Sequence, residues 1–144
     1  MTHTRRKVMV VPVRMGRDWE VLILRRGPAK GSVWAPVTGN LDEGEADTAG
    51  ARRELHEETG LGTVAALHDV GFTNTFQKEA AGQPIMFEES VWVAVIPLGV
   101  DPKLSHEHVD FRWVSPGEAI EAVAYDGCKE GVRRAVAAIE AKLR

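Results

Sequence analysis

Short apolar runs separated by turn-forming residues make up most of this chain. Runs rich in Val, Ile and Leu that are bounded by Gly, Pro and Asp are typical of strands. The predicted strands cover residues 8–13, 20–24, 33–38, 64–76, 85–98 and 111–114. The turn at residues 15–18 joins the first two as a hairpin, and Pro36 confines the third to an edge or an irregular position. The unbroken apolar run 91–96 suits a central strand covered on both faces.

Three segments are predicted as helices. The clearest is 45–59, which is rich in Ala, Arg, Glu and Leu and is followed by Gly60, a residue favoured just past a helix end. A second helix begins at Pro116, and an amphipathic third covers 127–143. Strands mixed with helices predict one α/β domain over residues 1–144, with helices on both sides of a sheet.

Composition and charge narrow the class of protein. The chain is 44% hydrophobic and 27% charged with a formal net charge of −3, which is typical of a soluble globular domain and argues against binding to a nucleic-acid polymer. Its only basic run, residues 5–7, is interpreted as a solvated N-terminal fringe. No long apolar stretch or signal-peptide pattern occurs, so we expect a cytoplasmic protein without a membrane span. The single cysteine, Cys128, excludes an intramolecular disulfide and is expected to be a small buried residue.

The candidate chemistry lies on the 45–59 helix. Glu54, Glu57 and Glu58 are three and four residues apart, so their carboxylates share one helical face. Each like-charged pair lowers helix stability by about 0.2–0.5 kcal/mol, and a bound cation would remove that repulsion. Oxygen-only ligands suit Mg²⁺, or Mn²⁺ as a substitute, better than zinc. The sequence therefore predicts a magnesium site on this helix.

The residues around the glutamates support this interpretation. Gly39 and Gly44 permit a tight loop that brings backbone carbonyls close to the carboxylates. Arg53 is placed to hydrogen-bond Glu45 or Glu57 and so to hold the loop against the helix. The opposite helix face is expected to pack on the sheet through Thr48, Ala51, Leu55 and Thr59.

The string from Gly39 to Leu61 reads G-x₅-E-x₇-R-E-U-x-E-E-x-G-U, where U is aliphatic. A Glu-rich helix face alone is usually a solvated face, but this string resembles the Nudix box and matches it at every defined position. The order of the flanking strands and the C-terminal helix also resembles that of Nudix hydrolases. The resemblance implies a Nudix α/β/α sandwich with a mixed β-sheet between helices. It also implies hydrolysis of a nucleoside diphosphate linked to another moiety.

The resemblance further implies roles for individual residues. The three helix glutamates would hold Mg²⁺ together with the carbonyl of Gly39, while Arg53 and Glu45 would orient them. A general base outside the box is common in this family, and Glu107 is predicted here as base or additional metal ligand. Glu88 and Glu89 are the competing candidates. The histidines beside Glu107, which are His106 and His108, are interpreted as a surface pair.

The segments 34–39, 89–92 and 107–113 resemble the Nudix branch that cleaves dATP and dihydroneopterin triphosphate. By this resemblance the substrate contacts are Lys7, Arg25, Trp34 and Thr38. Trp34 has two open interpretations, since it could stack on a base or pack in the core. The expected partner is a small-molecule nucleotide, and a monomer or a homodimer would suit the activity. The alternatives are a diadenosine polyphosphate hydrolase and a non-catalytic Nudix-fold binding module.

Overall fold

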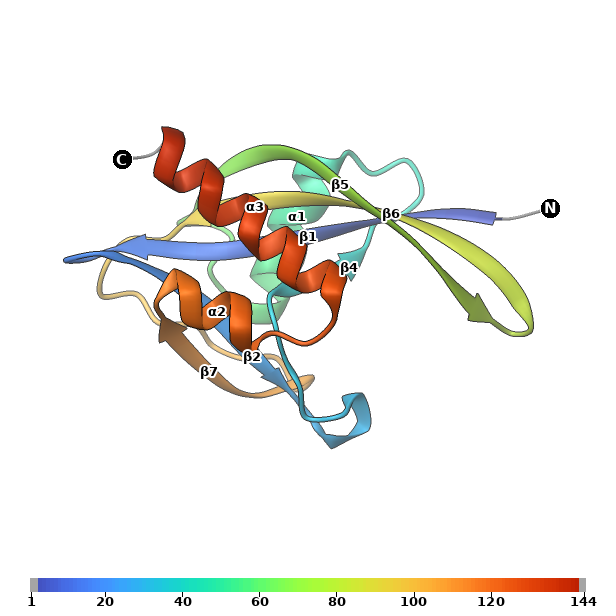
Figure 1. Ribbon diagram of the computed structural model, residues 1–144, viewed down its shortest axis with the longest axis horizontal. Helices are drawn as coiled ribbons and strands as arrows, with labels where there is room; N and C mark the ends of the chain where they lie inside the picture. Colours follow the sequence, from blue (N-terminus) through green and yellow to red (C-terminus); the bar gives the residue numbers. More distant parts are fainter. Residues whose placement is uncertain (1–2, 143–144) are drawn as a thin grey trace.

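The centre of the sheet is formed by two strands from distant parts of the chain. In the computed structural model, which describes residues 3–142, β1 (His3–Met15) runs parallel to β6 (Gln83–Val95). The strand β5 (Ala66–Ala80) pairs antiparallel with the other edge of β6. The hairpin of β5 and β6 projects at the end of the molecule where the chain begins (Figure 1).

The other edge of β1 is shared by two strands. The middle of β1 pairs with β4 (Val37–Asn40), and its C-terminal end pairs with β2 (Trp19–Arg26) through the predicted hairpin. The remaining strands, β3 (Trp34–Ala35) and β7 (His108–Val114), both pair with β2. The result is a seven-stranded mixed sheet.

Helices cover both faces of this sheet (Figure 1). The helix α1 (Asp47–Thr59) lies on one face, and α2 (Pro116–Ala122) and α3 (Asp126–Lys142) lie on the other. At the end of α1, Gly60 adopts a left-handed backbone with φ of 72° and donates its N–H to the carbonyl of His56, which closes the helix. A short 3₁₀ turn, η1 (Pro28–Lys30), follows β2.

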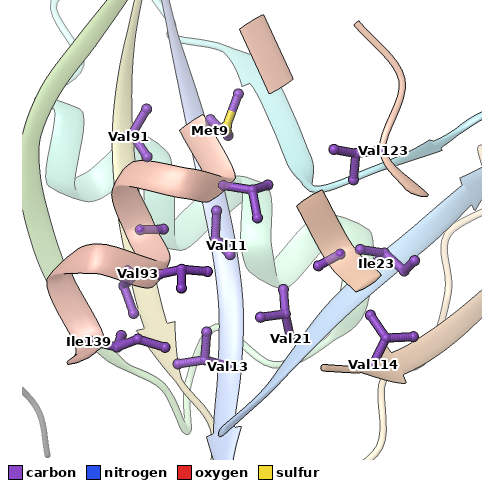
Figure 2. Close-up of a cluster of buried hydrophobic side chains, with 14 residues drawn as sticks. Met9, Val11, Val13, Val21, Ile23, Val91, Val93, Val114, Val123 and Ile139 are labelled. Atoms are coloured by element: carbon purple, nitrogen blue, oxygen red, sulfur yellow. The ribbon is translucent and has the colours of Figure 1, made fainter. Parts of the chain in front are cut away.

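The alternation of side chains along β1 divides the core into two layers. Odd-numbered residues such as Met9 and Val11 face α3, whereas even-numbered residues such as Val8 and Val10 face α1. Figure 2 shows the α3 layer, in which Met9, Val11, Val13, Val91 and Val93 gather with Ile139 of the helix. On the other side Leu55 of α1 is fully buried. Position along a strand therefore decides on which face a polar side chain emerges.

The structure confirms the predicted α/β/α sandwich and corrects several details. The predicted strand 33–38 is two short strands, because Pro36 separates β3, which pairs with β2, from β4, which pairs with β1. Residues 5–7 belong to β1; Arg5 and Arg6 are exposed as predicted, whereas Lys7 is half-buried and lines a cavity. Thr48 is exposed, contrary to the prediction that it packs on the sheet. The last residue of the predicted third helix, Leu143, lies outside the described residues.

None of the helices within residues 3–142 combines the length and the apolar character needed to cross a membrane.

Candidate active site

The three glutamates of α1 line one cavity of about 400 Å³, called the carboxylate cavity below. Glu54 and Glu58 are each 8% exposed, whereas the side chain of Glu57 is 52% exposed. Burial raises the pKa of the Glu54 carboxyl, and its hydrogen bond from Arg53 opposes that rise. The helical spacing thus brings three acidic groups to one cavity at different depths.

Arg53 joins the loop before α1 to these carboxylates. Its Nε and Nη2 donate to both oxygens of Glu45 at 2.9 Å each, and its Nη1 donates to Glu54 at 3.0 Å and Glu57 at 3.1 Å. Its Nη2 also donates to the carbonyl of Asn40 at 3.0 Å. The predicted hydrogen bonds from Arg53 to Glu45 and Glu57 are therefore both present. The hydrogen bonds from Arg53 lower the pKa of Glu45 to about 2.

Gly39 of β4 lies directly against the acidic face of α1. It pairs with Val8 in the ladder between β4 and β1, which fixes its backbone. A Cβ atom at this position would overlap the carboxylate of Glu54. The absence of a side chain at Gly39 therefore leaves the space in which that carboxylate lies.

The loop before β7 is docked on the C-terminal end of α1. Lys103 donates its backbone N–H to the carbonyl of Thr59 at 2.9 Å. Ser105 donates its backbone N–H to the carbonyl of Glu58 at 3.2 Å and its Oγ–H to the Glu58 carboxylate at 2.9 Å. These contacts bring Glu107 to the carboxylate cavity. Ser105 was not among the predicted site residues, and a serine in a loop carries no sequence signal that would single it out.

His108, the first residue of β7, also reaches Glu58. Its Nδ1 lies 2.8 Å from the Glu58 carboxylate, although the two atoms are not aligned as a hydrogen bond, and its side chain is 7% exposed. Burial lowers the pKa of His108, and the negative charge of Glu58 opposes that fall. The interpretation as a surface histidine is wrong for His108, while His106 is exposed and does not line the cavity.

Basic side chains line the rest of the carboxylate cavity. Lys7, Arg26 and Lys30 contribute to it, and Arg26 donates through Nη2 to the hydroxyl of Thr38 at 2.9 Å. Arg26 was missed in favour of its neighbour Arg25, which is exposed and donates to the carbonyl of Ser32 instead. Arg26 continues the alternation of Leu22 and Leu24, but the register shifts between Arg25 and Arg26, so alternation alone does not show which of the two arginines reaches the cavity.

The predicted substrate contacts fall into two groups. Lys7 and Thr38 line the carboxylate cavity, whereas Arg25 and Trp34 do not. Trp34 packs against the core layer beneath α2 and α3, and the Arg112 guanidinium lies 6.0 Å from its ring centre. The structure thus brings Trp34 to the core and away from the glutamates of α1.

The three candidates for a base are also separated. Glu107 lines the carboxylate cavity, while Glu89 lines a second cavity and Glu88 is exposed on the opposite face of β6. Of the three, only Glu107 therefore lies beside the glutamates of α1.

The donor set fits a hard divalent cation. Glu54, Glu57 and Glu58 supply only oxygen atoms, and Gly39 leaves room for a carboxylate and a carbonyl on one side. Within residues 3–142 no three acidic, His or Cys side chains already form a metal cage. Arg53 and His108 instead lie against the carboxylates, so their contacts would rearrange around an ion.

Comparison with known proteins agrees with this geometry. The model of the NUDIX domain matches residues 3–134. The chain is 37% identical over 122 residues to a Myxococcus xanthus protein named octanoyltransferase, and the matched region covers 85% of this chain and 34% of that protein. It is 30% identical over 99 residues to the asymmetrical bis(5'-nucleosyl)-tetraphosphatase of Rattus norvegicus, covering 67% of this chain and 65% of that protein. The chain thus spans less than two thirds of the length of either relative.

Solved structures show the same fold. The binary complex of a C. elegans Ap4A hydrolase is 26% identical with a TM-score of 0.76, over 95% of this chain and 98% of that one. The E. coli dihydroneopterin triphosphate pyrophosphohydrolase is 21% identical with a TM-score of 0.75, over 93% and 97% of the two chains. Because the family model extends over nearly the whole described chain and includes every box residue, this chain belongs to the NUDIX family.

Proposed function

We propose that this chain is a Mg²⁺-dependent pyrophosphohydrolase of a nucleoside triphosphate-like substrate such as a dNTP or dihydroneopterin triphosphate. Water would cleave one phosphoanhydride bond, and the products would be a monophosphate and pyrophosphate. The observation that carries the proposal is the division of the carboxylate cavity into an acidic wall on α1 and a basic wall formed by Lys7, Arg26 and Lys30. Family membership and the hydrolases among the relatives support the same class of reaction.

The acidic wall is the proposed metal site. Glu54, Glu57 and Glu58, with the carbonyl of Gly39, would hold Mg²⁺ or Mn²⁺. A bound divalent cation would supply Lewis-acid polarisation and charge neutralisation at the phosphoryl oxygens. Arg53 acts through the carboxylates, since its hydrogen bonds to Glu54 and Glu57 set their orientation before any ion binds.

The basic wall is the proposed phosphate site. The guanidinium of Arg26 and the ammonium of Lys30 can form charge-assisted hydrogen bonds with phosphate oxygens. The hydrogen bond from Arg26 to Thr38 restricts the guanidinium to a position between β2 and β4. Cations on one wall and carboxylates on the other would hold the phosphate chain across the cavity, with the bond to be cleaved beside α1.

Glu107 is the proposed base, or else an additional ligand. It lies in the loop that Ser105 ties to Glu58, and it lines the carboxylate cavity together with the glutamates of α1. A carboxylate in this place can accept the proton of the attacking water. Glu107→Gln removes that capacity while keeping the size of the side chain. An unchanged rate and metal dependence in this variant would exclude both roles.

A substrate screen tests the proposal. The purified chain is incubated with Mg²⁺ and dNTPs, dihydroneopterin triphosphate, diadenosine polyphosphates, ADP-ribose or nucleotide sugars, and the products are identified. We expect pyrophosphate from a triphosphate, loss of turnover with a chelator, and recovery with Mg²⁺ or Mn²⁺. Absence of turnover on every substrate would contradict the proposal and favour a non-catalytic binding module.

A second candidate function is hydrolysis of diadenosine polyphosphates. The relative from Rattus norvegicus is named as a tetraphosphatase of bis(5'-nucleosyl) substrates, and the C. elegans structure is that of an Ap4A hydrolase. Formation of ATP from a diadenosine polyphosphate, with little pyrophosphate from any triphosphate, would favour this candidate over the first.

A further inference from the structure

A second cavity of about 530 Å³ adjoins the carboxylate cavity. The two share Lys7, Arg26 and Thr38 in their linings, so these side chains lie at the boundary between them. The second cavity lies on the α3 face of the sheet, because Lys7 is two residues before Met9 on β1 and its side chain is on the same face. Its volume is within the range of about 300–1,000 Å³ found for small-molecule sites. A substrate whose phosphates lie at Arg26 would therefore place its organic part here.

Three polar side chains form a row across the sheet at this cavity. Lys7 of β1 is paired with Glu89 of β6, and Glu89 is paired with Asn74 of β5. Side chains at directly paired positions share a face and are neighbours. Asn74 donates through Nδ2 to the carbonyl of Gly127 at 2.9 Å, which ties the row to the beginning of α3.

Glu89 is the deepest charged group of this row, with 5% of its surface exposed. Burial raises the pKa of its carboxyl, while the charge of Lys7 and a hydrogen bond from Asn74 lower it. A carboxylate withdrawn from water costs stability unless N–H donors are supplied to it. Lys7 and Asn74 supply some of the N–H donors that the Glu89 carboxylate needs. A ligand with adjacent N–H groups would supply the remaining donors.

Aromatic side chains line the same cavity from two different elements. Phe76 comes from β5, and Tyr125 precedes α3 and is 64% exposed. Tyr125 has a left-handed backbone with φ of 69°, a conformation that costs free energy for a non-glycine residue and is concentrated at functional sites. Aromatic side chains provide surfaces on which a planar ring can stack.

We infer that the second cavity binds the ring of the substrate, and that Glu89 together with Lys7 selects a 2-amino-4-oxopyrimidine edge, the edge shared by guanine and pterins. This edge presents two neighbouring donors, a ring N–H and an amino group, beside a carbonyl oxygen. The Glu89 carboxylate can accept both N–H groups, and the Lys7 ammonium can donate to the oxygen. The inference rests on the proposed function, since it names the substrate class for that site.

Glu89 and Lys7 together disfavour the other nucleobases. Adenine and cytosine present one donor beside a ring nitrogen whose lone pair would face the carboxylate. Uracil and thymine present one N–H between two carbonyl oxygens, which the carboxylate repels. A site that hydrogen-bonds a substrate group discriminates strongly against an analogue that lacks it, because the buried group is then left unpaired. Selection therefore follows from the position of Glu89 in the row.

Equilibrium binding tests the inference without turnover. The affinities of the chain for dGMP and dAMP are measured by calorimetry without divalent metal, and we expect dGMP to bind at least about tenfold more tightly. Equal affinities, or tighter binding of dAMP, would overturn the inference. A preference for dGMP in a chain that hydrolyses no triphosphate would sustain it and would contradict only the proposed function.

A matched pair of variants then assigns the selectivity to Glu89. Glu89→Gln keeps the shape but replaces one acceptor by a donor, so we expect the preference for dGMP to fall by about 10- to 100-fold. Glu88→Gln makes the same chemical change at the next residue, which is exposed on the other face of β6, and should leave the preference unchanged. Equal behaviour of the two variants would refute the assignment.

A third variant keeps the test usable if Glu89→Gln does not fold. Tyr125→Gly removes the ring at a backbone conformation that glycine adopts freely. We expect weaker binding of dGMP and dAMP by a similar factor, about tenfold, because stacking tolerates any base. Unchanged binding of both nucleotides would overturn the placement of the ring in this cavity.

Steady-state kinetics show whether guanine or a pterin supplies the 2-amino-4-oxopyrimidine edge. We expect kcat/KM to be higher for dGTP or dihydroneopterin triphosphate than for dATP, and comparison of the first two shows whether the purine or the pterin is preferred. In Glu89→Gln the KM for the preferred substrate should rise about tenfold or more with little change in kcat, since the contact is remote from the bond cleaved. A fall in kcat at constant KM would contradict a role in ring selection.

Discussion

A single methyl group added at Gly39 tests whether the position of the Glu54 carboxylate decides activity. The new Cβ of Gly39→Ala would overlap that carboxylate. The backbone of Gly39 is held in the ladder by its pairing with Val8, whereas the carboxylate is the end of a flexible side chain. The carboxylate is therefore the group that moves, and the carbonyl of residue 39 stays in place.

The structure sets the size of the effect. Carbon atoms in contact are about 3.5–4.0 Å apart, so the Glu54 carboxylate must move by about 1 Å or more. A side chain forced off its rotamer costs about 0.5–1.5 kcal/mol, which is a modest loss of stability. A 1 Å misplacement at an active site can lower the rate by about 10²-fold, equivalent to about 2.7 kcal/mol of barrier. Gly39→Ala should therefore affect turnover more than folding.

Two measurements separate these effects. Initial rates of pyrophosphate release at several Mg²⁺ concentrations give kcat and the metal requirement, and urea unfolding gives the free energy of unfolding. Gly117→Ala is the control, because a Cβ at that exposed position meets no atom within 4 Å, and it should leave the rate unchanged. A wild-type kcat and Mg²⁺ dependence in Gly39→Ala would refute the reasoning.

Three further predictions concern the same helix and its contacts. Glu57→Gln and Glu58→Gln should each lower kcat by several orders of magnitude in steady-state assays while circular dichroism stays unchanged, because each removes one carboxylate from the proposed metal site. Ser105→Ala removes the hydroxyl donor to the buried Glu58 carboxylate, so kcat should fall about tenfold with little change in Tm. Glu45, whose hydrogen bonds from Arg53 lower its pKa to about 2 against about 4.3 when unfolded, stabilises the fold above about pH 4.5 and loses that contribution as pH falls towards 2. In Glu45→Gln the urea midpoint should consequently change less between pH 7 and pH 3 than in the wild type.

The helix that carries the site was predictable because its information is local. The spacing of Glu54, Glu57 and Glu58 depends only on helical geometry, and the end of the helix at Gly60 depends on one residue with a left-handed backbone. The hydrogen bonds of Arg53 to Glu45 also lie within one segment. Interactions within a few turns of chain require no knowledge of the rest of the fold.

Site residues contributed by other parts of the chain were harder to predict from the sequence. A change of register between Arg25 and Arg26 accompanies the end of the pairing of β2 with β7, and no local pattern shows which of two adjacent arginines turns inwards. The side chain of His108 is buried where the loop before β7 docks on the end of α1 through Ser105, a contact between distant parts of the chain. Glu89 faces the second cavity because of its parity on β6, which requires the pairing with β1 to be known.

The parallel pairing of β1 with β6 has a consequence for how the chain folds. The first strand cannot complete its ladder until the segment 83–95 is available, so the centre of the sheet depends on closing a long loop. Parallel pairing over such a separation is intrinsically slow, and refolding should be slower than that of a helical bundle of equal length. During synthesis one valine-rich edge of β1 stays unpaired until β6 has been made. Premature release of the chain at that stage would expose this edge to pairing with other chains and would favour aggregation.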